Sequence, residues 1–185
     1  MGRTVIALAV SAIVVAVQPW SAIGAARLAA RSAQASPPEL TARVNDFAGV
    51  LDAAAKAALE EVSARLQKAT GDVLVVATVK TRRPFASIDA YASEMFKNHG
   101  RGIGERSRDN GLLLVLAVDD REVRIHVGYG LEKIISNSFA GQTVQETMIP
   151  VLKTGDSGGG LLAGARRLAQ RLADARGVAL GLGPA

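Results

Sequence analysis

The order of apolar and polar residues between positions 52 and 100 predicts a helix, a strand and a second helix. Asp52 can cap the first helix, and its apolar residues recur at helical spacing until Gly71 ends it: Leu59, Val62, Leu66 and Ala69. The run from Val73 to Val79 is β-branched, apolar on both faces and of strand length. Ser87 can cap the second helix, which Gly100 ends and which has one apolar stripe: Ile88, Tyr91, Ala92, Met95 and Phe96.

The second half of the chain predicts a β-hairpin followed by two helices. Leu112 to Val118 is another strand with two apolar faces, and the third strand alternates apolar and polar residues, so residues 112–128 are expected to pair as a hairpin. A helix is then predicted from Ser138 to Met148, with Pro150 ending it. The last helix has an apolar side made of small and branched residues: Leu161, Leu162, Ala165, Leu168, Ala169 and Leu172.

These elements define a fold class. Strands that are apolar on both faces need helices above and below them. A right-handed crossover through the second helix makes the first two predicted strands parallel, while the hairpin adds an antiparallel one. We therefore expect an α/β protein, a three-layer α/β/α sandwich with a small mixed β-sheet. The expected domain covers residues 40–176, and residues 177–185 are expected to form a flexible C-terminal tail.

The first 35 residues are typical of a signal peptide. Val5 to Val17 is an apolar run preceded by Arg3, and small residues at Ala26 and Ala35 offer cleavage points. The alternative is an uncleaved N-terminal membrane anchor, although the run is shorter than the roughly 20 residues that span a bilayer. Residues 1–35 are thus predicted to be a signal peptide or anchor with a linker, and the mature protein to be periplasmic or secreted.

Composition narrows the function classes. The chain has 185 residues, 49% of them apolar, which is enough for a core, and it has no cysteine. A disulfide framework and a cysteine nucleophile or metal ligand are therefore excluded. The net charge is +5, but three of the 22 basic residues lie in the acid-free first 35 positions. Because the remaining excess is small, nucleic acid is not expected as a partner.

Two stretches carry candidate chemistry. Asp119-Asp120-Arg121 follows a buried strand, where α/β folds place their ligand crevices, and hard carboxylate oxygens suit Ca²⁺ or Mg²⁺. An ordinary hairpin turn explains the two aspartates equally well. The last helix has a basic outer face that can meet an acidic partner, anionic lipid or simply solvent: Arg166, Arg167, Arg171 and Arg176.

Several stretches together resemble the TPM domain family. They are residues 44–51 (VNDFAGVL), 110–115 (NGLLLV), 119–125 (DDREVRI), 127–132 (VGYGLE) and the glycine-rich stretch at 155–164. The similarity runs over residues 40–173 in the right order and spacing. It implies an exported or lumen-facing α/β/α sandwich with a carboxylate-lined groove for a divalent cation, Ca²⁺ or Mg²⁺, and weak acid phosphatase activity in some members.

The resemblance also assigns residues. Asp46, Asp119 and Asp120 fall on the family's acidic positions, and Asn137 stands where many relatives have an aspartate, so these four are the predicted metal ligands. Any hydrolysis is expected to use Asp119 and Asp120, with Arg121 neutralising a phosphate.

Two functions are therefore open. The favoured one is an accessory module that binds an envelope, membrane or secreted protein; the alternative is a weak metal-assisted acid phosphatase. Contact with a membrane is expected only through the N-terminal segment or the basic last helix.

Overall fold

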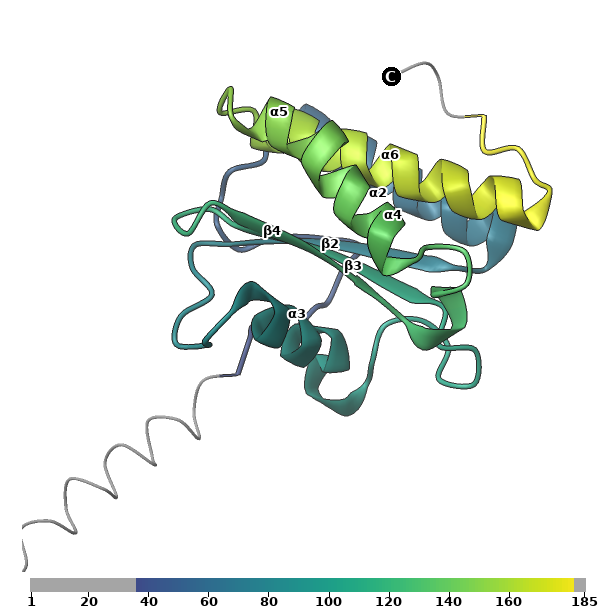
Figure 1. Cartoon of the computed structure of the whole chain (residues 1–185), viewed down its shortest axis with the longest axis horizontal. Coiled ribbons are helices and arrows are strands. Elements are labelled where there is room, and N and C mark those ends of the chain that lie inside the picture. The colour runs from purple at the N-terminus through teal and green to yellow at the C-terminus, as the bar shows by residue number, and fades with distance from the viewer. Residues whose placement is uncertain (1–35, 182–185) are drawn as a thin grey trace, which may run out of the picture. The chain divides into compact units, whose positions relative to one another are not determined.

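A computed structural model describes residues 36–181, which form a mixed sheet with helices on both faces (Figure 1). The predicted signal peptide and the last four residues lie outside the described part of the chain. The strands are β1 (Val44–Asp46), β2 (Val73–Val79), β3 (Gly111–Ala117) and β4 (Glu122–Val127). The main helices are α2 (Ala53–Thr70), α3 (Ile88–Lys97), α4 (Asn137–Gln142), α5 (Ile149–Leu152) and α6 (Ser157–Arg176). Short helical turns are η1 (Asn98–Gly100), η2 (Tyr129–Leu131) and the π-helical η3 (Thr143–Met148).

The four strands lie in the sheet in sequence order. β1 pairs parallel with β2 and β2 parallel with β3, whereas β4 pairs antiparallel with β3, bringing Val127 opposite Leu112. The C-terminal ends of the first three strands therefore lie side by side, and we call this end of the sheet, which runs across the strands, the carboxyl edge. The chain leaves β4 at the other end of the strands, which we call the opposite edge.

The sheet separates two apolar cores, as expected for strands with two buried faces. Leu112 and Leu114 of β3 belong to the core on the α2 and α6 side, while Leu113 and Val115 belong to the core on the α3 side. Figure 1 shows α2, α4, α5 and α6 above the sheet and α3 below it. The predicted α/β/α sandwich with a small mixed sheet is confirmed.

Local capping explains where two helices begin. The Asp52 side chain accepts a hydrogen bond from the Ala55 N–H at 2.6 Å, and the Ser87 hydroxyl accepts one from Ala90 at 3.1 Å. Gly71 ends α2 with a φ of 78°, a left-handed conformation that glycine adopts without steric cost. Both predicted starts are therefore confirmed, while α3 ends at Lys97 and the chain reaches Gly100 through η1.

Pro150 does not end the helix before it, so that prediction is wrong. α4 widens into the π-helical η3, in which the Ile149 N–H bonds to the Val144 carbonyl five residues back. Pro150 then stands in the first turn of α5, where its missing N–H has no intrahelical partner to lose. The helical segment consequently continues to Leu152 and reaches the carboxyl edge.

The compact part also extends beyond the predicted boundary at residue 176. Leu180 is 7% exposed and belongs to the α2 and α6 core, and Arg65 of α2 donates to the Gly181 carbonyl at 2.7 Å. Residues 178–181 therefore pack on the domain instead of forming part of a free tail.

Between Ser36 and Gly181, no helix combines the length and the apolar character needed to cross a membrane.

Candidate functional site: the carboxyl edge of the sheet

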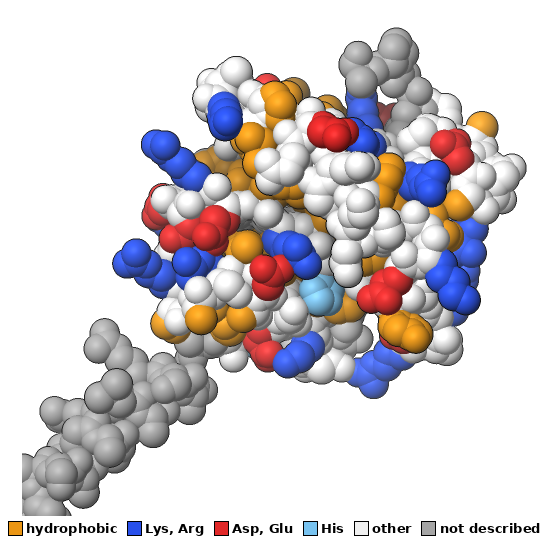
Figure 2. Space-filling view, in the orientation of Figure 1, with side chains coloured by type: hydrophobic (Ala, Val, Ile, Leu, Met, Phe, Trp, Pro, Cys, Tyr) orange, Lys and Arg blue, Asp and Glu red, His pale blue; other side chains and the backbone are white. Residues whose placement is uncertain are grey.

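A hollow of about 570 Å³ opens at the carboxyl edge, between the β3–β4 hairpin and the segment joining α5 to α6. Its walls are mostly apolar, and two cations and the start of α6 complete its lining: Leu116, Val118, Arg121, Val123, Ile149, Leu152, Lys153, Gly155 and Ser157. Figure 2 shows exposed apolar side chains between the hairpin tip and α5. Ligands of open α/β sheets bind at this edge, so the hollow is the candidate site.

Arg121 occupies the hairpin turn in an unusual conformation. Its φ is 55°, in the left-handed region that side chains other than glycine, asparagine and aspartate rarely adopt. Its N–H bonds to the Val118 carbonyl at 3.2 Å, which closes the turn. Neither Arg121 nor Lys153 makes an ion pair with another described residue. The lining therefore contains two unneutralised cations and no carboxylate.

Asp120 turns toward the loop after β2 and is not part of the lining. Its Oδ2 accepts hydrogen bonds from the Thr81 hydroxyl at 2.9 Å and the Arg82 N–H at 2.7 Å. The hydrogen bonds from the Arg82 backbone and the Thr81 hydroxyl, together with the charges of Arg82 and Arg83, lower the pKa of Asp120, while desolvation opposes them. Asp119 precedes it and is exposed, with its N–H bound to the Lys80 carbonyl at 2.8 Å.

Asp46 organises the loop that follows β1. Its Oδ1 accepts from the N–H groups of Gly49 at 3.0 Å and Val50 at 3.1 Å and from the Thr78 hydroxyl, and its Oδ2 accepts from the Leu51 N–H at 3.1 Å. Burial raises the pKa of Asp46, but these hydrogen bonds outweigh it and hold the pKa below its ordinary value. The carboxylate is thus already surrounded by donors, and its visible role is structural.

Asn137 lies at the other end of the sheet from the three aspartates. It is the first residue of α4, and the residues around it contact the second half of α6: Arg171 donates to the Ile134 carbonyl at 3.3 Å and stacks over the Phe139 ring. α6 starts at the carboxyl edge and runs to the opposite edge, where Arg176 meets Asp72. Asn137 therefore lies beside the second half of α6, away from the carboxyl edge.

The four predicted ligands are not arranged to coordinate one cation together. The structure brings Asp46, Asp119 and Asp120 to the carboxyl edge but leaves Asn137 at the opposite edge, and the oxygens of Asp46 already accept four hydrogen bonds. In the described part of the chain, no group of three or more acidic or histidine side chains is arranged to hold a metal ion. We therefore derive no chemical step through a bound cation.

Three arginines of α6 bind residues of the same domain. Arg176 binds Asp72 with two hydrogen bonds, and Arg167 binds the Thr147 hydroxyl at 2.7 Å and Glu146 at 3.3 Å. Arg167 and Arg171 also lie over the Phe139 ring, 5.3 and 5.4 Å from its centre. Contact of this basic face with an acidic partner or anionic lipid stays a prediction.

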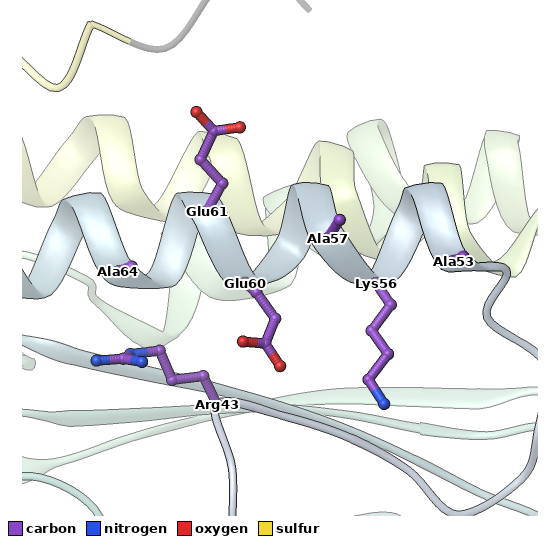
Figure 3. Close-up of a pocket in the computed structure, with 7 residues that line it drawn as sticks. All are labelled: Arg43, Ala53, Lys56, Ala57, Glu60, Glu61 and Ala64. Atoms are coloured by element: carbon purple, nitrogen blue, oxygen red, sulfur yellow. The ribbon is translucent and has the colours of Figure 1, made fainter.

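A second hollow, of about 620 Å³, lies along the outer side of α2 beside Arg43 (Figure 3). Its floor consists of small alanines, and Figure 3 shows Lys56 and Glu60 projecting from the side of α2 that faces Arg43, while Glu61 projects from the opposite side. Arg43 itself is held by Gln67 at 2.9 Å. This surface has charges of both signs and no deep apolar wall, so it is a weaker candidate for a ligand site than the hollow at the carboxyl edge.

Comparison with known proteins gives the family. The fold is an α/β/α domain with a hollow at the carboxyl edge of a mixed sheet. The chain belongs to the TPM domain family, which matches residues 44–171. No curated protein matches the chain.

Solved structures share the fold. The N-terminal domain of a Porphyromonas gingivalis protein is similar at 27% identity and a TM-score of 0.66, with 73% of this chain and 84% of that one covered. The N-terminal domain of a Corynebacterium glutamicum protein is 15% identical with a TM-score of 0.57, over 82% and 90% of the chains. A protein from Bizionia argentinensis is 23% identical with a TM-score of 0.57, over 67% and 82%.

Sequence reasoning found Arg121 and the glycine-rich stretch that begins at Gly155 but missed Lys153 and the apolar wall of the hollow. Leu116 and Val123 were predicted only as strand residues. Lys153 is placed at the carboxyl edge by the helical turn through Pro150, which the sequence predicts to be a stop. Lys153 lies just before the glycine-rich stretch in the sequence, but only the fold shows that it lines one hollow with Arg121.

Proposed function

We propose that the protein is an exported accessory module that binds another envelope or secreted protein at the carboxyl edge of its sheet. The observation that carries the proposal is the hollow of about 570 Å³ with apolar walls. An apolar recess with a few polar groups is typical of a surface that binds a ligand or a partner. The resemblance to the TPM family and the apolar run in residues 1–35 support export.

The chemistry at the hollow favours binding over hydrolysis. General acid catalysis needs a group that holds a proton near neutral pH. Asp46 and Asp120 have lowered pKa values and are ionised there, so neither can protonate a leaving group. His126 is on β4 and packs against Phe96 of α3, on the other face of the sheet from the hollow. Weak metal-assisted phosphatase activity remains the alternative function.

Photo-crosslinking in cells tests the proposed binding function. A photo-crosslinking amino acid at Val118, in the wall of the hollow, is expected to trap a defined envelope or secreted protein in intact cells. The same amino acid at Ala57, on the outer side of α2, is the matched control and is expected to trap nothing at that mass. Equal crosslinking from both positions contradicts the proposal.

The phosphatase alternative is tested on the purified protein. We expect no turnover of p-nitrophenyl phosphate with millimolar Ca²⁺ or Mg²⁺. A kcat of roughly 1 s⁻¹ or more, in the ordinary enzyme range, that Asp119→Asn abolishes would establish the enzyme instead.

A further inference from the structure

Resting on the proposed function, we infer that the carboxyl-edge hollow binds the apolar carboxyl-terminal end of a partner protein, with Arg121 and Lys153 pairing with the terminal carboxylate. The inference concerns the chemistry of the partner, which the shape and charge of the hollow specify.

The walls determine the apolar part of the ligand. Leu116 comes from β3 and Val118 directly follows it, Val123 comes from β4, and Ile149 and Leu152 come from α5. These side chains form the floor and sides of a hollow of about 570 Å³, within the range of roughly 300–1,000 Å³ typical of ligand pockets. Burying apolar side chains of a ligand there removes apolar surface of both partners from water, which favours binding.

The charges determine the polar part. Both ionisable residues of the lining are cationic, and neither has an ion pair among residues 36–181. The two carboxylates adjacent to Arg121 in the sequence have other partners: Asp120 accepts from Thr81 and the Arg82 backbone, and Glu122 accepts from the Arg82 side chain. The hollow is therefore complementary to an anion bearing apolar groups.

The start of α6 lies on the same side. Gly155 and Ser157 line the hollow. The Ser157 N–H bonds to the Gly155 carbonyl at 3.1 Å and the Gly159 N–H to the Asp156 carboxylate at 2.7 Å, so these two donors are taken. What the 20-residue helix adds is the positive end of its dipole. A chain terminus joins a carboxylate directly to neighbouring apolar side chains, and this combination matches a lining of apolar side chains and two cations.

The conformation of Arg121 is consistent with this role. The left-handed conformation is strained for most side chains, and the hairpin turn would form more easily with glycine or asparagine at position 121. Asparagine in this position removes the charge while keeping the backbone conformation. Arg121→Asn is therefore a variant that tests charge with little risk to folding.

The experiment measures binding of labelled peptides to the purified chain by fluorescence anisotropy. The probe is the hexapeptide Gly-Ser-Gly-Ala-Leu-Val, labelled at its N-terminus, with a free carboxyl terminus. Its C-terminal amide tests the carboxylate, and Gly-Ser-Gly-Ala-Ser-Ser with a free terminus tests the apolar side chains. We expect the amide and the polar peptide each to bind at least about tenfold more weakly than the probe.

Variants locate the site. Arg121→Asn and Lys153→Gln are expected to weaken binding of the free-carboxylate probe at least about fivefold each and to leave binding of the amide unchanged. Lys56→Gln removes the same charge from the outer side of α2 and is expected to change the affinity less than twofold. Thermal melting of each variant checks that it is folded.

Several results would overturn the inference. Equal affinity for the free acid and the amide would show that the carboxylate is not recognised. No binding at 1 mM peptide would show that the hollow does not bind a peptide terminus. Binding of laurate in place of the peptides assigns the hollow to a lipid. A dimer that Arg121→Asn dissociates assigns it to a second copy of the chain. If the peptides fail while the Val118 crosslink persists, this inference falls and the proposed function stands; if both fail, both fall.

Discussion

Asp72 and Arg176 form a two-point ion pair that ties the start of β2 to the end of α6, 104 residues apart in the sequence. The Nε of Arg176 donates to Oδ2 of Asp72 at 3.2 Å and its Nη2 donates to Oδ1 at 3.1 Å. Asp72 is fully buried, whereas 35% of the Arg176 side chain is exposed. The pair therefore holds the far end of α6 while the near end of the helix lines the hollow.

Removing Arg176 is expected to destabilise the protein. Arg176→Met keeps much of the side-chain volume but leaves the Asp72 carboxylate buried without its charged donors, and a hydrogen bond to a charged group contributes about 1.5–3 kcal/mol. We expect the free energy of unfolding, measured in urea, to fall by about that amount. Lys56→Met on the exposed side of α2 is the control, and an equal loss there would contradict the assignment.

Asp46→Asn is expected to destabilise the loop after β1. The amide has one acceptor oxygen in place of two and cannot satisfy the Leu51 N–H together with the other three donors, so a loss of about 1.5–3 kcal/mol is expected. The urea midpoint should fall, and the Leu51 amide should exchange faster with solvent. Asp119→Asn, an exposed carboxylate on the same edge, should leave both quantities unchanged. Equal effects of the two substitutions would rule out the structural role of Asp46.

His126 is expected to make stability depend on pH. Burial, and then the charge of Arg124, lower the pKa of His126 more than Asp89 and Glu132 raise it. The unfolded chain therefore binds a proton at a higher pH than the folded protein, and stability falls as the pH drops below about 6.5, the ordinary pKa of histidine. Urea unfolding at pH 7.5 and pH 5.5 should show this loss, and His126→Gln should reduce it. An unchanged pH slope in the variant would assign the loss to other groups.

The part of the fold that sequence could predict is the part set by local signals. Asp52 and Ser87 cap helices through bonds to residues three positions away, and the two-sided apolar strands dictate helices on both faces. β1 could not be predicted, because Val44–Asp46 has only three residues, two of them polar, and it forms because β2 pairs with it.

The candidate site depended more strongly on tertiary structure. The family resemblance groups Asp46, Asp119 and Asp120, and in the structure Asp46 ends β1 while Asp119 and Asp120 follow β3, so that all three lie at the carboxyl edge. The sequence cannot show that Asp46 is surrounded by donors from its own loop, nor that Asn137 begins its helix at the opposite edge. The hollow combines residues from four segments, and its apolar residues cannot be told from core residues by periodicity alone.

Export stays a prediction that mass spectrometry can check. The apolar run after Arg3 and the small residues before Ser36 predict cleavage by a signal peptidase. We expect the N-terminus of the mature protein to lie between residues 23 and 36 and the protein to be in the periplasm or medium. Intact Met1 on a protein from the cytosol contradicts export, while intact Met1 in the membrane fraction indicates the anchor.

Binding of Ca²⁺ or Mg²⁺ also stays a prediction, and the geometry makes its test sharper. The sequence predicts one shared site of Asp46, Asp119, Asp120 and Asn137, but the structure keeps Asn137 apart from the other three. Any stabilisation by millimolar calcium is therefore expected to depend on the adjacent carboxylates Asp119 and Asp120 and not on Asn137. A cation that binds only the folded protein with a Kd near 1 mM adds about 0.4 kcal/mol at 1 mM, which shifts the melting temperature by a few degrees at most.

The measurement is the melting temperature with and without calcium for the unmodified chain, Asp120→Asn and Asn137→Ala. We expect Asp120→Asn to remove the calcium-dependent rise and Asn137→Ala to keep it, because the amide of Asn137 begins α4 at the far edge of the sheet. Magnesium at the same concentration separates a selective site from general screening of the two negative charges, since screening depends on ionic strength and not on the identity of the ion. Equal blunting by both substitutions would mean that the four residues do come together when the cation binds, and that the carboxyl edge and α4 move to form its site.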